Sequence, residues 1–306
     1  MLKITGLKKS YKGYPVLKNL NMNIEKGDVY GFVGTNGCGK TTTMNIICNI
    51  IPKDEGDISF ENEAVKIGFL PESPALYGYM NGSEYLDFIG ACCHYEGDVK
   101  TRTAEVLEMT GMTEGAKRLI RGYSRGMNQR IGIAAALYAN PDLLILDEPT
   151  SALDPEGRAE VMAIIQGLAA SGSTIILCTH ILADIERVAN KVGILKNGII
   201  AVEGTIPSIK QQFEREIAVH IRLRNTPTES NPLCHMECVQ RSDIWYGGIT
   251  IYAKHGISEA EFFYNAVTTL AENKILPEAI EFKRISLEQI YIGINSGTLL
   301  HGGMAI

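Results

Sequence analysis

The sequence lacks three features that would indicate a membrane-embedded, secreted or nucleic-acid-binding protein. It has no uninterrupted apolar run of the roughly 18 residues that a membrane helix requires, because its best candidate, Ile131–Leu146, is interrupted by Asn140, Pro141 and Asp142. The N-terminus has no apolar segment followed by a cleavage site, so we expect the chain not to be secreted. The net charge is −6, so no general basic surface favours a nucleic-acid partner, and none is expected.

The sequence also lacks the cysteine pattern of a disulfide framework. Its seven cysteines are odd in number and scattered, as is typical of reduced cytoplasmic thiols. Cys92, Cys93 and His94 are adjacent and face different sides of a predicted helix, and the segment Cys234–Cys238 has no second pair to complete a metal site. We therefore interpret both clusters as ordinary core or surface residues. With 306 residues and 45% hydrophobic content, the chain can form one large or two ordinary globular domains.

A phosphate-binding loop is the clearest motif that is present. It consists of Gly34, Thr35, Asn36, Gly37, Cys38, Gly39, Lys40, Thr41 and Thr42. An apolar run precedes it and a helix-like run follows it, which is the context that this glycine-rich pattern requires. The glycines allow backbone N–H groups to curve around phosphate oxygens, and the new helix directs its positive end at the same anion. The alternative is a glycine-rich turn that ends in Lys-Thr by chance.

The side chains of this loop suit a nucleoside triphosphate. Lys40 supplies a charge for the β and γ phosphates, Thr41 offers a hydroxyl to Mg²⁺, and Thr42 can reach the α-phosphate. Cys38 lies at the positive end of a helix, where a thiolate is favoured, so we hypothesise that it is reactive and that ATP protects it. The alternative for Cys38 is that it only replaces a small residue and is inert.

Acidic and basic side chains follow two buried strands further along the chain. Asp147 and Glu148 come after the aliphatic run Leu143–Leu146, and His180 follows Ser173–Thr179. In phosphate-loop enzymes the first carboxylate helps to hold Mg²⁺, and a second carboxylate beside it can polarise an attacking water. An acidic helix cap and a structural histidine are the alternatives for these residues.

The alternation of strands and helices predicts an α/β fold. Residues 2–33 alternate as an antiparallel β unit, and residues 83–132 have a helical pattern between β segments. After Pro207 the pattern changes to a small α+β region. This region contains a hairpin at Gly247-Gly248 and capping boxes at Ser258 and Ser286.

Together with further motifs, this loop resembles the ATP-binding subunit of an ABC transporter. Tyr11 matches the adenine-stacking aromatic, Glu72 the Q-loop and His180 the switch histidine, while Ser124–Met127 matches the signature and Ser151–Asp154 the D-loop. The resemblance covers residues 1 to about 206. The form Tyr-Ser-x-Gly-Met-x-Gln-Arg from Tyr123 onward resembles the branch that serves ABC-2-type exporters, and Ser286–Tyr291 is similar to the tail of that branch.

The resemblance implies a phosphate-loop NTPase of the RecA-like kind. In it, an ABC nucleotide-binding domain over residues 1–206 carries an antiparallel β subdomain and a helical subdomain at about 73–132. Residues 207–306 would form an accessory α+β domain, for which we hypothesise a dimerising or regulatory role. The implied nucleotide contacts come from Tyr11, the phosphate loop, Glu72, Ser124, Gly126, Met127 and Asp154. The implied metal ligands for Mg²⁺ are Thr41, Glu72 and Asp147, and the catalytic residues are Glu148 and His180.

The resemblance also implies partners and a location. Two copies would meet head to tail around ATP, and an integral membrane permease would hold them at the inner, cytoplasmic face of the cell membrane. Leu76, Tyr77, Tyr79 and Met80 are candidates for the docking groove, with a satisfied core as the alternative. Two departures matter, since Glu72 replaces the usual Gln and Met127 stands where Gln is usual.

Two other classes compete with a transporter subunit. A soluble ABC ATPase that acts on nucleic acid or the ribosome usually has long insertions or two nucleotide domains, and this chain has neither. A regulatory protein with a degenerate ATPase is disfavoured because Lys40, Asp147, Glu148 and His180 are intact. The leading prediction is an ATP-hydrolysing subunit that powers an ABC-type membrane transporter, in the export direction.

Overall fold

The computed structural model describes residues 1–62, 64–214 and 216–297, and these form two compact units. Unit 1 comprises Met1–Ile209 together with the chain from Tyr291 onward, and unit 2 comprises Lys210–Ile290. The sequence-based expectation placed all of 207–306 in one accessory domain, whereas the structure groups the described residues from Tyr291 onward with unit 1. The reason is local, because Ile294 is buried and its carbonyl accepts a hydrogen bond from Lys196 Nζ at 2.6 Å. Residues 298–306 of the expected domain lie outside the described part of the chain.

A six-stranded sheet forms the centre of unit 1. Its order is β5 (Ile67–Leu70), β6 (Leu143–Asp147), β7 (Thr174–Cys178), β3 (Val29–Gly34), β8 (Lys191–Lys196) and β9 (Ile199–Thr205). The first five strands are parallel and β9 closes the edge as an antiparallel hairpin with β8. Every residue of β3, β6 and β7 is buried, as the continuous apolar runs predict for strands covered on both faces.

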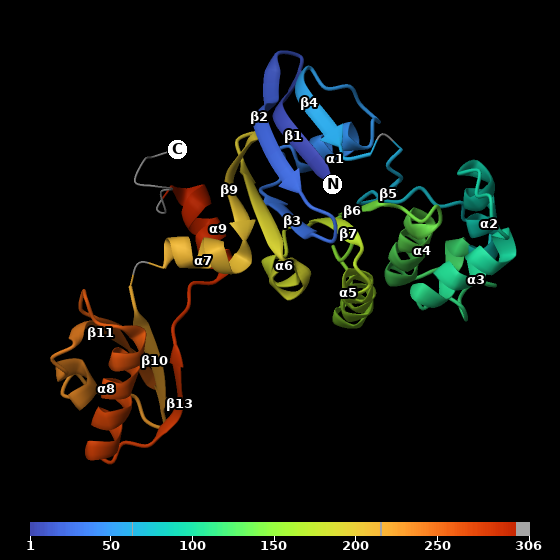
Figure 1. Ribbon diagram of the computed structural model, residues 1–306. Helices are drawn as coiled ribbons and strands as arrows, with labels where there is room; N and C mark the ends of the chain where they lie inside the picture. Colours follow the sequence, from blue (N-terminus) through green and yellow to red (C-terminus); the bar gives the residue numbers. More distant parts are fainter. Residues whose placement is uncertain (63, 215, 298–306) are drawn as a thin grey trace. The chain divides into compact units, whose positions relative to one another are not determined.

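A second, antiparallel sheet shares its core with the first. It consists of β2 (Tyr14–Ile24), β1 (Leu2–Tyr11) and β4 (Glu55–Phe60), in that order. Its inward residues, such as Leu7 and Leu20, belong to the same buried cluster as Met44 of helix α1 (Lys40–Ile47) and Ile145 of β6. Helix α1 therefore lies between the two sheets (Figure 1), which fixes the start of this helix, where the phosphate loop ends.

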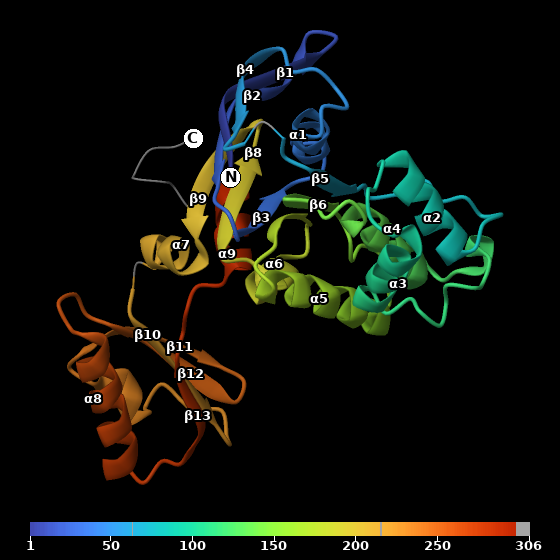
Figure 2. The ribbon, with the colours of Figure 1, turned by 45° about the vertical axis from the view of Figure 1, so that its right-hand side comes forward.

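The helices between α1 and β8 form two groups (Figure 2). Helices α2 (Gly82–Cys92), α3 (Val99–Met109) and α4 (Arg125–Leu137), with a 3₁₀ turn at Ile120–Gly122, form the helical insertion between β5 and β6. The buried Arg102 joins this group by donating to the carbonyls of Leu137 and Tyr138 at the end of α4. Helices α5 (Pro155–Ala170) and α6 (Leu182–Val188) follow β6 and β7. Within the described residues, no helix is both long and apolar enough to cross a bilayer.

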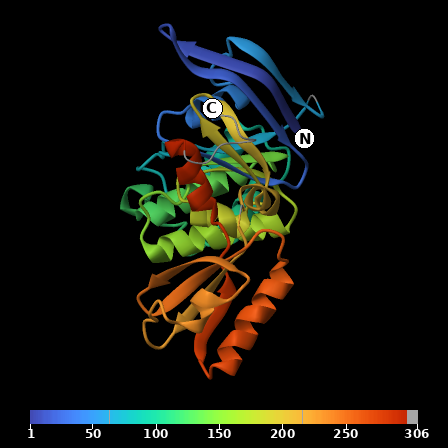
Figure 3. The same cartoon turned by 90° about the vertical axis from the view of Figure 1, so that its left-hand side faces the viewer.

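Unit 2 is a four-stranded antiparallel sheet with one helix along one face (Figures 1 and 3). The strand order is β11 (Val239–Trp245), β12 (Gly248–Ala253), β10 (Ala218–Leu223) and β13 (Pro277–Phe282), and α8 (Glu259–Glu272) packs Phe262, Ala266 and Leu270 against it. This is the split β-α-β arrangement, with a 3₁₀ turn at Pro232–His235 in place of its first helix. The predicted hairpin is β11–β12, and Ser258 caps α8 as expected.

Two elements near the division between the units were not predicted. Helix α7 (Ile206–Phe213) runs through Pro207, where the sequence pattern indicated a break, because proline fits the first turn of a helix. Strand β13 has an irregular apolar pattern and, among the described strands, pairs only with β10. Helix α9 (Leu287–Ser296) begins at the predicted capping box, in which Gln289 N donates to Ser286 Oγ and Ser286 N to Gln289 Oε1.

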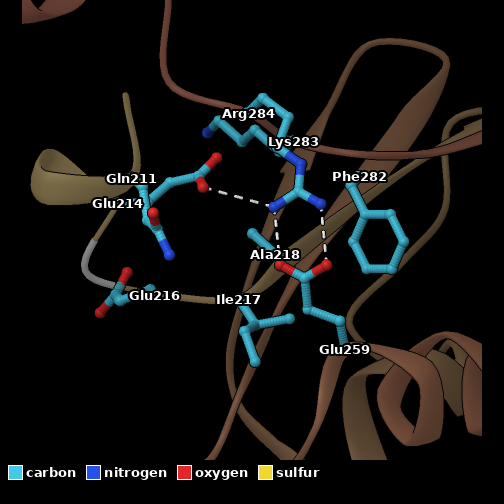
Figure 4. Close-up of a pocket in the computed structure, with 9 residues that line it drawn as sticks. All are labelled: Gln211, Glu214, Glu216, Ile217, Ala218, Glu259, Phe282, Lys283 and Arg284. Atoms are coloured by element: carbon cyan, nitrogen blue, oxygen red, sulfur yellow. Dashed lines mark hydrogen bonds and ion pairs between the residues drawn. The ribbon is translucent and has the colours of Figure 1, made fainter. Parts of the chain in front are cut away.

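One arginine ties together the segments by which the chain enters and leaves unit 2. Arg284 donates two hydrogen bonds to the carboxylate of Glu259, at 2.6 and 2.8 Å, and one to Glu214 at 3.3 Å (Figure 4). These residues line a pocket of about 210 Å³ with Phe282 and Lys283. Glu259 lies in the first turn of α8, where a carboxylate is favourable.

Candidate functional site

The phosphate loop connects β3 to α1 in a conformation that requires glycine at two positions. Gly39 has φ +112°, and a Cβ there would lie 2.6 Å from Leu17 Cδ2 of β2. A Cβ on Gly34 would lie 2.5 Å from Cys38 Sγ and 2.8 Å from the carbonyl oxygen of Leu195. The loop is therefore compressed between β2 on one side and β8 on the other, and larger residues would displace it.

Lys40 and Thr41 begin α1 with their side chains in defined contacts. Lys40 Nζ donates to the carbonyls of Gly34, at 2.8 Å, and Thr35, at 3.3 Å, so the ammonium group lies within the curve of the loop. Thr41 Oγ1 donates to Asp147 Oδ2 at 3.0 Å, which joins the loop to the end of β6. Burial raises the pKa of Asp147, hydrogen bonds from Thr41 and Cys178 oppose the increase, and the charge of Glu72 adds to it.

Glu148 is held in a strained backbone conformation beside His180. Its φ is +50°, a left-handed value that costs a non-glycine residue about 1–3 kcal/mol and is found most often at functional sites. Its N–H donates to the carbonyl of Cys178 at 2.7 Å, which holds it against β7. The Glu148 carboxylate is buried, and its Oε2 lies 2.8 Å from Nδ1 of the exposed His180. Thr179 Oγ1 donates to the same oxygen at 3.4 Å.

One pocket brings most of the predicted residues together. It has a volume of about 490 Å³ and is lined by Val16, Asn36, Gly37, Gly39, Lys40, Thr41, Thr42, Glu72, Asp147, Glu148, Ser151 and His180. Ten of these twelve are predicted site residues, and Ser151 belongs to the matched D-loop. Val16 was missed, because only the fold brings β2 against the phosphate loop and no pattern in its own segment indicates a ligand.

Ser124, Gly126 and Asp154 line a second pocket, of about 290 Å³. Ser124 caps α4 by accepting a hydrogen bond from Met127 N at 3.2 Å, and Asp154 caps α5 by accepting one from Gly157 N at 2.9 Å. None of these three residues lines the phosphate-loop pocket. Within one chain, therefore, the signature segment and the phosphate loop are at separate sites.

The other predicted residues line neither of these two pockets: Tyr11, Gly34, Thr35, Cys38 and Met127. Gly34 and Thr35 instead supply the carbonyls that hold Lys40. Tyr11 ends β1 as an exposed ring, with Lys9 Nζ 5.6 Å from its centroid. Met127 contributes its backbone N–H to the Ser124 cap, and its sulfur contacts Arg118.

Of the two interpretations of Cys38, the structure favours the inert one. Its sulfur is buried beneath the loop in the core that contains Leu17, Met44 and Leu195. Burial raises the pKa of Cys38, and the neighbouring Lys40 charge and loop N–H groups only partly offset this. The helix-terminus argument is sound for an exposed thiol, but desolvation of the thiolate is the larger effect here. These observations support the interpretation of Cys38 as a packing residue, and its slow reaction with thiol reagents stays a prediction.

Comparison with known proteins identifies the family. Residues 17–151 match the sequence model of the family described as "ABC transporter". The chain is 37% identical over 222 residues to the uncharacterized ABC transporter ATP-binding protein YxlF of Bacillus subtilis (strain 168), which covers 71% of this chain and 75% of YxlF. The chain belongs to the ABC transporter ATP-binding proteins. This chain is also 39% identical over 209 residues to the lantibiotic transport ATP-binding protein SrtF of Streptococcus pyogenes. The match covers 66% of this chain and 90% of SrtF.

The fold of this ABC protein is shared with solved cassettes. One is the dimeric post-hydrolysis structure of the ATP-binding cassette MJ0796 bound to ADP and Pi, with a TM-score of 0.61 and 27% identity over 67% of this chain and 99% of that one. The predicted family, phosphate-loop α/β fold and ATPase activity are thereby confirmed. The protein binds and hydrolyses ATP as a subunit of an ABC transporter, and the alternative of a soluble ATPase acting on nucleic acid or the ribosome is not favoured.

Proposed function

We propose that two copies of this chain close head to tail around ATP and thereby drive an export permease in the cell membrane. The observation that carries the proposal is the placement of Lys40, the Thr41–Asp147 pair and the Glu148–His180 pair around one pocket. In the proposed reaction Glu148 orients or deprotonates the attacking water and His180 contacts the γ-phosphate. Lys40 stabilises the charge that develops on the phosphates.

The separation of the two pockets supports the head-to-tail arrangement. Ser124 and Gly126 lie outside the phosphate-loop pocket of their own chain, so they are available to a nucleotide bound by a second copy. Asp154 shares their pocket and would couple the two sites across the interface. Tyr11 is exposed at the end of β1 and would stack on the adenine.

The donor set of the phosphate-loop pocket fits Mg²⁺. The Thr41 hydroxyl and the Asp147 carboxylate are hard oxygen donors 3.0 Å apart, and the Glu72 carboxylate lines the same pocket. Mg²⁺ is usually held by one or two carboxylates with phosphate oxygens and water. When bound, the ion would neutralise charge on the β and γ phosphates. Burial raises the pKa of Asp147, and a cation bound beside it would offset that effect by stabilising the ionised carboxylate.

We place the permease contact at a groove beside Glu72. This groove, of about 440 Å³, is lined by Glu72, Pro74, Leu76, Gly78, Tyr123 and neighbouring residues. Exposed rings continue the surface, since Tyr77 contacts Tyr79 and Phe88. Met80 lies between them and the 3₁₀ turn at Ile120. Arg121, Arg125, Asn128 and Gln129 also line the groove, so a polar surface with exposed aromatic rings beside it suits an amphipathic helix of a membrane partner. Glu72 lines both this groove and the nucleotide pocket.

Resemblance supports the proposed export direction and location. The segments Tyr123–Arg130 and Ser286–Tyr291 are similar to the ABC-2-type exporter branch, and SrtF is a lantibiotic transport protein. The chain would act on the cytoplasmic face of the cell membrane through its permease. Purification of tagged protein from membranes should recover a polytopic protein, and recovery should fall when Tyr79 is replaced by Asp.

A mixing experiment tests the shared site. Lys40→Ala removes the loop charge, and Gly126→Asp places a carboxylate at the signature, where a Cβ has room because its nearest neighbour, Gly157 Cα, is 3.7 Å away. If each site uses one loop and the other copy's signature, a mixed dimer keeps one intact site. An equal mixture of the two inactive variants should then recover about a quarter of wild-type ATPase activity, because about half of the dimers are mixed. No recovery would contradict the head-to-tail arrangement.

A further inference from the structure

A buried carboxylate outside both pockets joins three segments of the site. Asp184 of α6 is only 4% exposed, and both of its oxygens are used. Thr150 Oγ1 donates to Oδ2 at 2.7 Å, while Arg158 Nε and Nη2 donate to Oδ1 at 3.0 and 2.7 Å. None of the three residues lines the phosphate-loop pocket or the signature pocket.

Each of the three residues lies close in the sequence to a residue with a proposed role in ATP hydrolysis. Thr150 comes two residues after Glu148, and Asp184 comes four residues after His180. Arg158 lies in the first turn of α5, which Asp154 caps. The Thr150–Asp184–Arg158 network therefore connects the segment of the general base, the segment of the switch histidine and the D-loop helix.

Thr150 also lies between two strained residues. Glu148 has φ +50° and Ala152 has φ +52°, and neither is a glycine or an asparagine. Such conformations persist only where surrounding contacts hold them. The backbone supplies three, from Glu148 N to Cys178 O at 2.7 Å, from Ser151 N to Glu148 O at 3.1 Å and from Leu153 N to Thr150 O at 3.4 Å. The Thr150 side chain supplies a fourth, which anchors this turn to α6.

We propose that Asp184 is a positioning residue for ATP hydrolysis. Through the hydrogen bonds that it accepts from Thr150 and Arg158, it fixes the positions of Glu148 and the D-loop relative to His180. The proposal rests on the roles assigned above to Glu148 and His180. Arg158 is the counter-ion that allows this carboxylate to remain buried, and Thr150 is the group that transmits its position to the strained turn. Because none of the three residues lines the nucleotide pocket, loss of the network should affect turnover far more than nucleotide binding.

Thr150→Val in the full-length chain tests this with little disturbance, because valine keeps the shape of threonine and removes only the hydroxyl. We expect kcat for ATP to fall about 10-fold to 100-fold, as for a catalytic group displaced by about 1 Å. The dissociation constant of a fluorescent ATP analogue should change less than about threefold, which is under 1 kcal/mol. Thr150→Ser restores the hydroxyl and should recover most of the lost turnover.

The matched control is Ile165→Val, a fully buried position on the same helix as Arg158 that shortens one side chain without touching Asp184. It should lower the melting temperature while leaving kcat close to that of the wild type. Combining Thr150→Val with Asp184→Ala should reduce kcat little beyond the larger single effect, because each change removes the hydrogen bond between positions 150 and 184.

Two outcomes would overturn the proposal. One is a Thr150→Val variant whose kcat is no lower than that of Ile165→Val at an equal melting temperature. The other is a loss that valine and serine at position 150 share. Glu148→Gln is measured alongside as the reference for the proposed base. If Glu148→Gln is inactive and Thr150→Val is fully active, only the positioning network fails, whereas an active Glu148→Gln would disprove the role of the base itself.

Discussion

Glu148 Oε2 lies 2.8 Å from His180 Nδ1, which joins the ends of two neighbouring strands across the nucleotide pocket. The two side chains differ in environment, because the carboxylate is buried and the imidazole is largely exposed. A buried carboxylate at a strained backbone position is suited to act on a water at the γ-phosphate, while the exposed ring remains free to contact the phosphate itself.

Glu148→Gln should therefore separate binding from turnover. The amide keeps the size of the side chain and cannot accept a proton, so ATPase activity should fall at least about 100-fold with ATP binding retained. ATP should then hold the protein as a dimer, which light scattering after gel filtration would detect. Glu108→Gln, an exposed change on α3 that lines neither pocket, is the control and should remain active. Unchanged ATPase activity in Glu148→Gln would remove this residue from the mechanism.

Asp147→Asn should stabilise the nucleotide-free protein at neutral pH. Because burial raises the folded-state pKa of Asp147, the folded state binds its proton more tightly than the unfolded state does. The free energy of unfolding then decreases as the pH rises from the unfolded pKa through the folded pKa, and the deficit persists above it. The neutral amide avoids this deficit and can still accept the hydrogen bond from Thr41.

The gain from Asp147→Asn follows the direction of this pKa shift, so the variant should unfold at a higher urea concentration than the wild type at neutral pH. Urea unfolding at pH 8 and at pH 4 would measure it, and the advantage of the variant should shrink at the lower pH. The same change should weaken the Mg²⁺ dependence of nucleotide binding. An equal or lower stability than wild type at pH 8 would contradict the electrostatic argument.

Cys38 should be among the slow thiols to react, despite its place in the phosphate loop. Its sulfur is buried and burial raises its pKa, whereas Cys92 and Cys93 are exposed. Brief treatment with iodoacetamide at pH 7.5, followed by peptide mass spectrometry, should show modification of the exposed pair at least about tenfold faster. In denaturant the rates should become similar. Fast labelling of Cys38 that ATP prevents would restore the original hypothesis of a reactive thiolate.

The phosphate loop and the strand ends could be predicted because their signals are local. An apolar run, glycines and a Lys-Thr pair specify β3, the loop and α1, and Asp147, Glu148 and His180 each follow a run of buried aliphatic residues. Parallel strands end at one edge of a sheet, so these side chains were expected to meet. By contrast, the Thr150–Asp184 contact depends on the packing of α6 beside α5, which no local pattern encodes.

Two other differences have the same origin. The helix-terminus effect at Cys38 can be inferred from the sequence, but the burial that outweighs it requires the position of β8. The return of the chain to unit 1 at Tyr291 was not predicted because capping boxes indicate where a helix begins and not what it packs against. Because α9 belongs to unit 1, a test of the role of unit 2 should remove unit 2 and keep α9.

Removal of residues 210–284 should be compared with truncation after residue 209. The first variant replaces those residues by a Gly/Ser linker of about 20 residues, whose root-mean-square span is about 25 Å, and keeps Ser286 and α9. The truncated variant also loses the buried Ile294 and the hydrogen bond from Lys196 to its carbonyl. Burial of an isoleucine and a hydrogen bond from a charged group together stabilise a protein by about 3 kcal/mol.

The truncated variant should therefore melt about 6–12 °C lower than the excised variant, because about 1 kcal/mol shifts the melting temperature of a domain of this size by about 2–4 °C. The excised variant should retain the ATPase unit, so a weaker ATP-dependent dimer on the Glu148→Gln background would assign dimerisation to unit 2. Equal melting temperatures in the two variants would mean that α9 contributes nothing to unit 1. An unchanged dimer and unchanged turnover after excision would exclude a dimerising or regulatory role for unit 2, because the stability of the ATPase unit is controlled within the same experiment.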